Sequence, residues 1–239
     1  MSAASDRYEK LIASTIDSIP GLAATQGTDV KYSDVLIKKG NTKTWLEVKM
    51  NHTDNLSNPR MFYMNSVWQS TYKTPAAYEA LRILNASADA DKFIKSISKF
   101  SGIPYKHIII GTTKSHLKME GAVPLEIMKN YFAQPNVNRY ILKNDNYPIG
   151  KLVTKHYLEG KAEPAHYLQA GDDFYRIGTN DPFKLGMSIP ALSGNGAFKI
   201  RVSTRTHFYE VQAEIKIVSM PHSKYSIHPD SKKINPFLK

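Results

Sequence analysis

Three residues near the start of the chain have side chains that phosphate chemistry uses: Asp34, Glu47 and Lys49. Two neighbouring carboxylates repel each other unless a cation lies between them, and Mg²⁺ prefers oxygen ligands of this kind. A metal ion held there can bind a phosphate oxygen and lower the pKa of a bound water, while a lysine can orient that water or stabilise charge on the phosphate. The three residues predict metal-assisted hydrolysis if the fold brings them together.

A β-hairpin over residues 33–50 is expected to position these side chains. Apolar residues alternate with polar ones on both arms, and the turn-forming pair Gly40-Asn41 lies between the arms. An alternating strand places its apolar residues on one face, which can enter the core, and its polar residues on the other. The apolar residues are Val35, Ile37, Leu46 and Val48.

The pairing of the two arms decides whether the acidic residues meet. If Lys38 pairs with Lys43 around the four-residue turn 39–42, Asp34 lies opposite Glu47, and both share a face with Lys49 and with Trp45. A slip of one residue would put the two carboxylates on opposite faces. The alternative interpretation is an ordinary amphipathic hairpin with a charged outer face.

The segment Ser33-Asp34-Val35-Leu36-Ile37, followed by Trp45-Leu46-Glu47-Val48-Lys49, resembles the signature of the PD-(D/E)XK nuclease superfamily, an acidic residue and then an acid-x-Lys on the next strand. The resemblance ends near Met50, and Ser33 stands where the family loosely keeps Pro. It implies a restriction-endonuclease-like core in which Asp34, Glu47 and Lys49 are catalytic. Asp34 and Glu47 would bind Mg²⁺, for which Mn²⁺ can substitute. Many such nucleases also use a Glu on the preceding helix, where this chain has Glu9.

Glu-x-Lys occurs twice more, at Glu159 and Glu214. We interpret Leu158-Glu159-Gly160-Lys161, with Pro164 close by, as a turn without strand context. Glu214 lies on an alternating segment, but the preceding strand offers bases and no acid opposite it. This pair of segments predicts a surface hairpin with salt bridges, and contacts to DNA phosphates through Lys199, Arg201 and Arg205.

The charge of the chain indicates a polyanionic partner. Its 32 Lys and Arg against 21 Asp and Glu give a net charge of +11. Between Lys92 and Lys118 there are six lysines and no acidic residue, and Lys92, Lys95 and Lys99 fall on one face of an expected helix. We expect this basic ridge, Lys92, Lys95 and Lys99, to contact DNA phosphates, although a solvated helix face is the simpler alternative.

Periodicity predicts an α/β fold with a mixed central sheet flanked by helices, followed by a β-rich C-terminal part. Residues 1–160 are expected to form the nuclease core, 161–221 a β-rich DNA-recognition part, and 222–239 a basic tail that extends as an arm. The expected helices span 6–19, 60–73, 75–86, 89–101 and 124–132, and a buried strand is expected over 107–111.

Other classes of protein are excluded by composition. The sequence has no apolar run long enough to span a membrane, no apparent secretory signal and no cysteine, so we expect a cytoplasmic protein without disulfides or thiolate metal sites. The expected activity is that of a Mg²⁺-dependent DNA endonuclease of the restriction or phage type, acting on duplex DNA, for which a homodimer would suit double-strand cleavage. An exonuclease or repair nuclease, and a non-catalytic basic nucleic-acid-binding protein, remain as alternatives.

Overall fold

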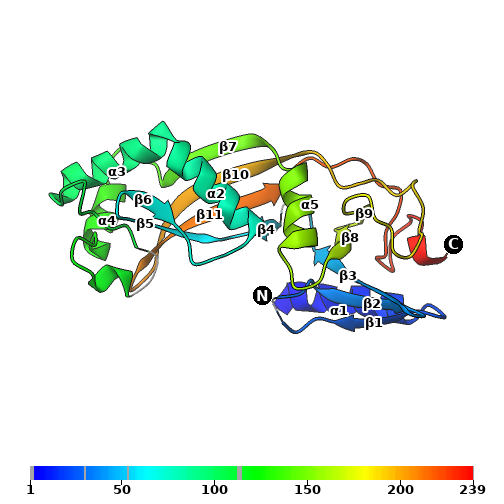
Figure 1. The fold of residues 1–239 in the computed structure, drawn as a ribbon. Coiled ribbons are helices and arrows are strands. Elements are labelled where there is room, and N and C mark those ends of the chain that lie inside the picture. Colours follow the sequence, from blue (N-terminus) through cyan, green and yellow to red (C-terminus); the bar gives the residue numbers. More distant parts are fainter. Residues whose placement is uncertain (1–2, 30, 53, 112–114, 239) are drawn as a thin grey trace. The chain divides into compact units, whose positions relative to one another are not determined.

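A computed structural model describes residues 3–29, 31–52, 54–111 and 115–238 of the chain (Figure 1). The helices are α1 (Ala3–Asp17), α2 (Pro75–Ala86), α3 (Ala88–Ser101), α4 (Leu125–Phe132) and α5 (Gly150–Glu159), with single 3₁₀ turns η1 (His116–Lys118) and η2 (Pro236–Leu238). The strands are β1 (Ala23–Gln26), β2 (Val35–Lys39), β3 (Thr42–Lys49), β4 (Asn55–Ser57), β5 (Arg60–Met64), β6 (Val67–Gln69), β7 (Tyr140–Pro148), β8 (Ala165–Ala170), β9 (Asp173–Arg176), β10 (Asn195–Thr204) and β11 (Tyr209–Ile217).

The chain forms two compact units that alternate along the sequence. Unit 1 comprises the residues up to Asp54, Pro148–Gly196 and the residues from Ile217 onward, whereas unit 2 comprises Asn55–Tyr147 and Ala197–Lys216. This division differs from the expected boundaries after residues 160 and 221. The difference arises because β8, which comes late in the sequence, pairs with β3 in unit 1, with unit 2 inserted between them in the chain.

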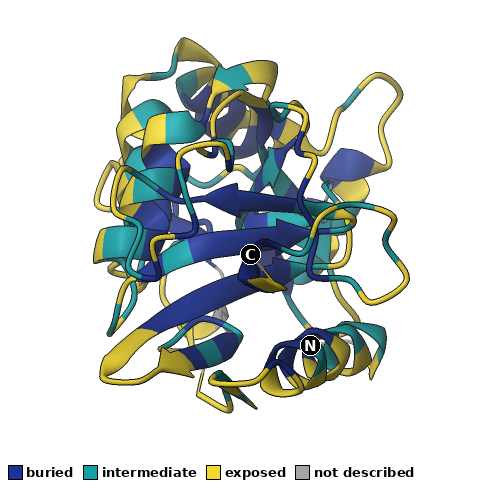
Figure 2. Cartoon of the chain, turned by 90° about the vertical axis from the view of Figure 1, so that its right-hand side faces the viewer, coloured by how far each residue is buried: buried dark blue, intermediate teal, exposed yellow. Residues whose placement is uncertain are grey.

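Unit 1 is built on a mixed five-stranded sheet with the order β1-β2-β3-β8-β9. Neighbouring strands are antiparallel except β3 and β8, which run parallel. Helix α1 packs against β1, β2 and β3, and Figure 2 shows its alternating buried and exposed positions beside the N-terminal label. Its buried Ile12 and Ile16 join the core formed by one face of the sheet, which includes Val35, Ile37, Leu46, Val48 and Tyr167.

The predicted hairpin register is confirmed. Lys38 pairs with Lys43, and Val35 pairs with Leu46. The turn is tighter than expected because Lys39 also pairs with Thr42, which leaves Gly40-Asn41 as a two-residue loop. Gly40 has φ +56°, a left-handed conformation that glycine adopts without steric penalty.

Unit 2 contains a sheet with the order β6-β5-β11-β10-β7, to which β4 adds by pairing with β11. Helices α2, α3 and α4 agree with the predicted spans, and Thr74 caps α2 by accepting a hydrogen bond from Ala77 N. The buried residues Ile108–Ile110 contribute isolated bridges instead of a full strand.

The predicted helix over 60–73 is wrong, because this segment forms the hairpin β5–β6. Asn65 and Ser66 both have positive φ, which reverses the chain between two short strands. The run Met61–Tyr63 is buried throughout, so its apolar residues did not reveal a strand period.

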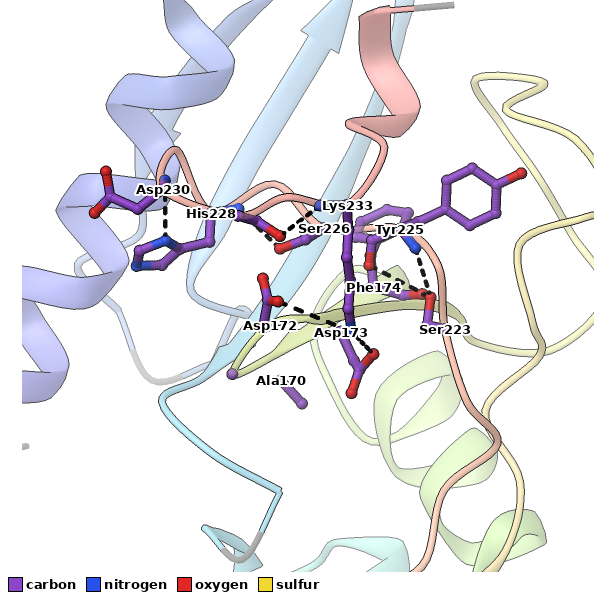
Figure 3. Close-up of polar contacts among 12 residues, drawn as sticks. Ala170, Asp172, Asp173, Phe174, Ser223, Tyr225, Ser226, His228, Asp230 and Lys233 are labelled. Atoms are coloured by element: carbon purple, nitrogen blue, oxygen red, sulfur yellow. Dashed lines mark hydrogen bonds and ion pairs between the residues drawn. The ribbon is translucent and has the colours of Figure 1, made fainter.

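The predicted extended arm after residue 222 is also wrong. Tyr225 and Ile227 are 1% and 0% exposed and belong to the core of unit 1. Figure 3 shows this segment running beside the β8–β9 turn, where Ser223 Oγ donates to the Phe174 carbonyl over 2.7 Å. The tail therefore completes unit 1.

The broad prediction of a mixed α/β fold with a strand-rich second half is confirmed. None of the described helices has the length and apolar character needed to span a bilayer.

Candidate active site

The centre of the candidate site is the β3 face that carries Glu47 and Lys49. Because side chains alternate along a strand, these two lie opposite to the face where Leu46 and Val48 enter the core with α1. Glu47 is 3% exposed, and the Lys49 ammonium contacts its Oε1 atom at 2.5 Å. The Tyr157 hydroxyl, from α5, donates to the same oxygen over 3.1 Å. A buried carboxylate is thus held between a cation and a phenol.

Asp34 lies directly before β2, at the end of the hairpin. Continuing the observed register places it opposite Glu47, and its Oδ2 atom accepts a hydrogen bond from the Val48 amide over 2.8 Å. Burial, followed by the charge of Glu47, raises the pKa of Asp34 to about 7. The charge of Lys49 lowers the pKa of Asp34 but does not outweigh burial and the charge of Glu47.

The pKa of Glu47 shifts in the opposite direction to that of Asp34. Burial alone would raise its pKa, but the charges of Lys49 and Lys161 outweigh burial and hold the pKa of Glu47 below its ordinary value. Its second oxygen, Oε2, is buried and has no hydrogen-bond partner in the described part of the chain. Ser33 lies close enough to help lower the pKa, yet its buried hydroxyl also lacks a partner of proper geometry. A buried carboxylate oxygen without a donor is suited to a cation.

Lys49 remains positively charged in this environment. Burial alone would lower its pKa, but the charges of Glu47 and Asp34 raise the pKa of Lys49 above its ordinary value. Lys49 can therefore stabilise negative charge beside the two carboxylates.

Glu9 lies on α1, the helix that packs on the sheet face opposite to Glu47 and Lys49. It is 4% exposed, and its Oε2 accepts a hydrogen bond from the Gln26 amide over 3.0 Å. Its charge contributes, as a small effect, to the raised pKa of Asp34. Glu9 is therefore a buried residue near Asp34, and Gln26 holds it in position.

Three residues that sequence reasoning missed come from α5 and the turn after it: His156, Tyr157 and Lys161. Burial and the charge of Glu47 raise the pKa of Tyr157, whereas burial lowers the pKa of His156 to about 4 and keeps it neutral. Lys161 donates to the Tyr32 carbonyl over 3.1 Å. The segment 158–161 was interpreted as a turn without a role; it does end α5, but Lys161 contributes to the electrostatics of the site.

The basic ridge lies on α3 in unit 2. Lys92 and Lys95 form ion pairs with Asp89 at 3.1 Å and with Asp91 at 2.7 Å, whereas Lys99 has none among the described residues. The acid-free stretch begins directly after Asp91, and these two aspartates neutralise part of the ridge's charge. All three lysines are exposed.

The other predicted DNA-contacting residues lie on the β10–β11 hairpin, which carries the salt bridges that the sequence predicted. Arg201 pairs with Glu214 at 2.5 Å, and Arg205 pairs with Glu210 at 3.3 Å. Lys199 contacts Asp145 at 2.9 Å. These cations lie in unit 2, whereas Asp34, Glu47 and Lys49 lie in unit 1.

The residues fit a metal ion only in part. Within the described ranges, no group of three or more His, Cys, Asp or Glu side chains is arranged to hold one. Asp34 and Glu47 supply two carboxylates, one with an unpartnered buried oxygen. Mg²⁺ commonly binds proteins through one or two carboxylates and completes its shell with water and substrate phosphate.

No family model matches the chain, and neither a curated protein nor a solved structure resembles it significantly. The resemblance of residues 33–50 to a nuclease signature therefore rests on those residues and their geometry.

Proposed function

We propose that the protein hydrolyses phosphodiester bonds in DNA with the help of Mg²⁺, as a member of the PD-(D/E)XK superfamily. The observation that carries this proposal is the hairpin register, which places Asp34 and Glu47 together and puts Lys49 beside them. The raised pKa of Asp34 and the unpartnered Oε2 of Glu47 support it, because a cation bound between the two carboxylates would favour the charged form of Asp34 and give that oxygen a partner.

Asp34 and Glu47 would hold the metal ion, which supplies a water of lowered pKa and a contact for a phosphate oxygen. Two side chains of the protein would assist this reaction. Lys49 stays cationic and can stabilise negative charge on the phosphate as the attacking oxygen adds. Tyr157 fixes the orientation of the Glu47 carboxylate through its hydrogen bond.

Duplex DNA is the proposed substrate, with endonucleolytic cleavage of the restriction or phage type. The net charge of +11 supports a polyanionic partner, and the exposed lysines of the ridge can contact phosphates without reading sequence. Cleavage of both strands at one site would favour a homodimer.

A non-catalytic DNA-binding protein is the second candidate. It is favoured by the ion pair that already neutralises Glu47 and by the lack of a three-residue metal group among the described residues. Such a protein would share the basic charge and need no metal.

Two substrates separate these functions: supercoiled circular DNA and linear DNA, each incubated with purified protein and either Mg²⁺ or EDTA. An endonuclease nicks or linearises the circle only with Mg²⁺, an exonuclease degrades linear DNA alone, and a binder leaves both intact. Glu47→Gln should abolish cleavage. The matched control is Glu159→Gln, which alters an exposed acid-x-Lys glutamate at the end of α5. Equal activity of Glu47→Gln and wild type would refute the proposed site.

A further inference from the structure

A histidine–aspartate pair lies at the carboxyl ends of the parallel strands β3 and β8. His52 follows the last residue of β3 closely, and its Nε2 atom lies 2.9 Å from Asp173 Oδ2 and 3.0 Å from the Ala170 carbonyl oxygen. The backbones also meet here, since the Gly171 amide donates to the Lys49 carbonyl over 2.8 Å. All of these residues belong to unit 1.

The pair shares a sheet face with the proposed catalytic lysine. Lys49 is paired with Ala170 across β3 and β8, and Ala170 is paired with Asp173 across β8 and β9. Side chains at paired positions point to the same face, so Asp173 and the imidazole it holds lie on the side of Lys49. Two strand spacings separate Lys49 and Asp173, about 10 Å. His52 and Lys49 both remain partly exposed, with 36% and 23% of their side chains accessible.

The contacts fix which nitrogen of His52 carries a proton in the neutral ring. A backbone carbonyl can only accept, so Nε2 must donate to Ala170 and Asp173. The other nitrogen, Nδ1, has no hydrogen-bond partner among the described residues. An imidazole anchored through one nitrogen by a carboxylate, with the other nitrogen free, can transfer a proton at the free nitrogen.

We propose that His52 is the general acid that protonates the leaving oxygen when the phosphodiester is cleaved, an inference that rests on the proposed function. Water attacks phosphorus and releases a proton to solvent. The bond between phosphorus and the bridging oxygen of the leaving nucleoside breaks, and that oxygen takes the Nδ1 proton of the imidazolium form of His52. The ring then regains a proton from solvent.

Asp173 and Lys233 are the positioning residues. Asp173 uses Oδ2 for His52 and Oδ1 for the Lys233 ammonium at 2.5 Å. Figure 3 shows the Lys233 side chain reaching Asp173 from the C-terminal segment. The segment around Tyr225 is buried in unit 1 and precedes Lys233 in the chain. The C-terminal segment therefore holds the aspartate that orients His52.

The test compares His52 variants with wild type in Mg²⁺-dependent nicking of supercoiled DNA. His52→Ala should nick about 10² to 10⁴ times more slowly, and added imidazole should restore part of the rate because it can carry the missing proton. DNA binding in EDTA should be unchanged. His52→Gln keeps a donor for the Ala170 carbonyl but cannot transfer a proton, so it should be as slow as His52→Ala while staying folded. His228→Ala is the matched control, because this histidine stacks on Tyr8 nearby and its Nδ1 accepts from Asp230 N.

Asp173→Asn should lower the rate less than His52→Ala and should not respond to imidazole, because it misorients an imidazole that is still present. A wild-type rate in His52→Gln, or a loss in His52→Ala that imidazole cannot restore, would show that the pair only ties β3 to β9. If either of these results is found while wild type cleaves and Asp34→Asn does not, only the role of His52 is overturned, and the proposed function stands. If wild type shows no Mg²⁺-dependent cleavage, the proposed function and this inference both fail.

Discussion

Replacing Asp34 with Asn should stabilise the metal-free protein at neutral and alkaline pH. The Asn side chain can still accept the hydrogen bond from Val48 N, so geometry is conserved while a buried negative charge is removed. The folded-state pKa of Asp34 is raised from 3.8 to about 7. The folded wild type therefore binds more protons than the unfolded chain between these values, and its stability falls as pH rises through this window.

The size of the effect follows from the shift. A rise of the Asp34 pKa from 3.8 to about 7 would correspond to at most about 4 kcal/mol above pH 7. Because Asp34 retains partial contact with solvent, we expect the variant to gain about 1 to 2 kcal/mol. The gain should be absent below about pH 4, grow up to about pH 7, and then stay constant.

Urea unfolding in EDTA, repeated from pH 4 to pH 9, measures this difference. Glu159→Gln removes an exposed carboxylate from the same unit and should show no such pH dependence. Addition of Mg²⁺ should then stabilise wild type and Glu159→Gln but not Asp34→Asn, because binding to the folded state shifts unfolding by mass action. A variant that is less stable than wild type at pH 8 in EDTA would refute the argument that burial and the charge of Glu47 make the ionised form of Asp34 unfavourable in the metal-free protein.

Three further outcomes are expected. Lys49→Ala should keep the stabilisation by Mg²⁺ but lose most of the cleavage rate, and equal rates in a nicking assay would remove the lysine from the mechanism. Replacing Lys92, Lys95 and Lys99 together by Ala should weaken binding to any DNA sequence. The slope of log affinity against log salt concentration should become shallower by less than the roughly 0.9 expected for each lost contact of an unpaired cation, because two of these lysines are paired with aspartates. Titrations at several salt concentrations measure this slope, and an unchanged slope would place the ridge away from DNA. Tyr225→Ala should lower the free energy of unfolding by about 3 to 5 kcal/mol, as for other buried aromatic residues; denaturant unfolding checks it, and a loss below about 0.5 kcal/mol would contradict the packing of the tail.

The hairpin was predictable because local signals agree. Alternation on both arms and a Gly-Asn turn set a register that nearby residues alone enforce, so Val35 and Leu46 meet as expected. The hairpin β5–β6 was not predictable in the same way, since Met61–Tyr63 is buried throughout and shows no alternation.

The residues around the candidate site that the sequence did not predict depend on contacts between segments far apart in the chain. Tyr157 reaches Glu47 only because β8 pairs with β3 and places α5 over that face. Asp173 meets His52 through the same pairing. A signal for α5 existed in the spacing of its buried residues Leu152, Val153, His156 and Tyr157, but nothing local indicates which strand that helix covers.

The pairing of β3 with β8 also determines when the site can form during protein synthesis. The hairpin is translated before β8, so Glu47 and Lys49 lie on an edge strand, paired with β2 alone, until Ala165–Ala170 has been made. Residues from Ile217 onward, which include the buried Tyr225 and the Lys233 that contacts Asp173, are translated after β8 and β9. Closing a long loop is entropically unfavourable and makes such pairings slow to form. The arrangement of Asp173 and His52 beside the candidate site can therefore be completed only after the segment that carries Lys233 has been translated.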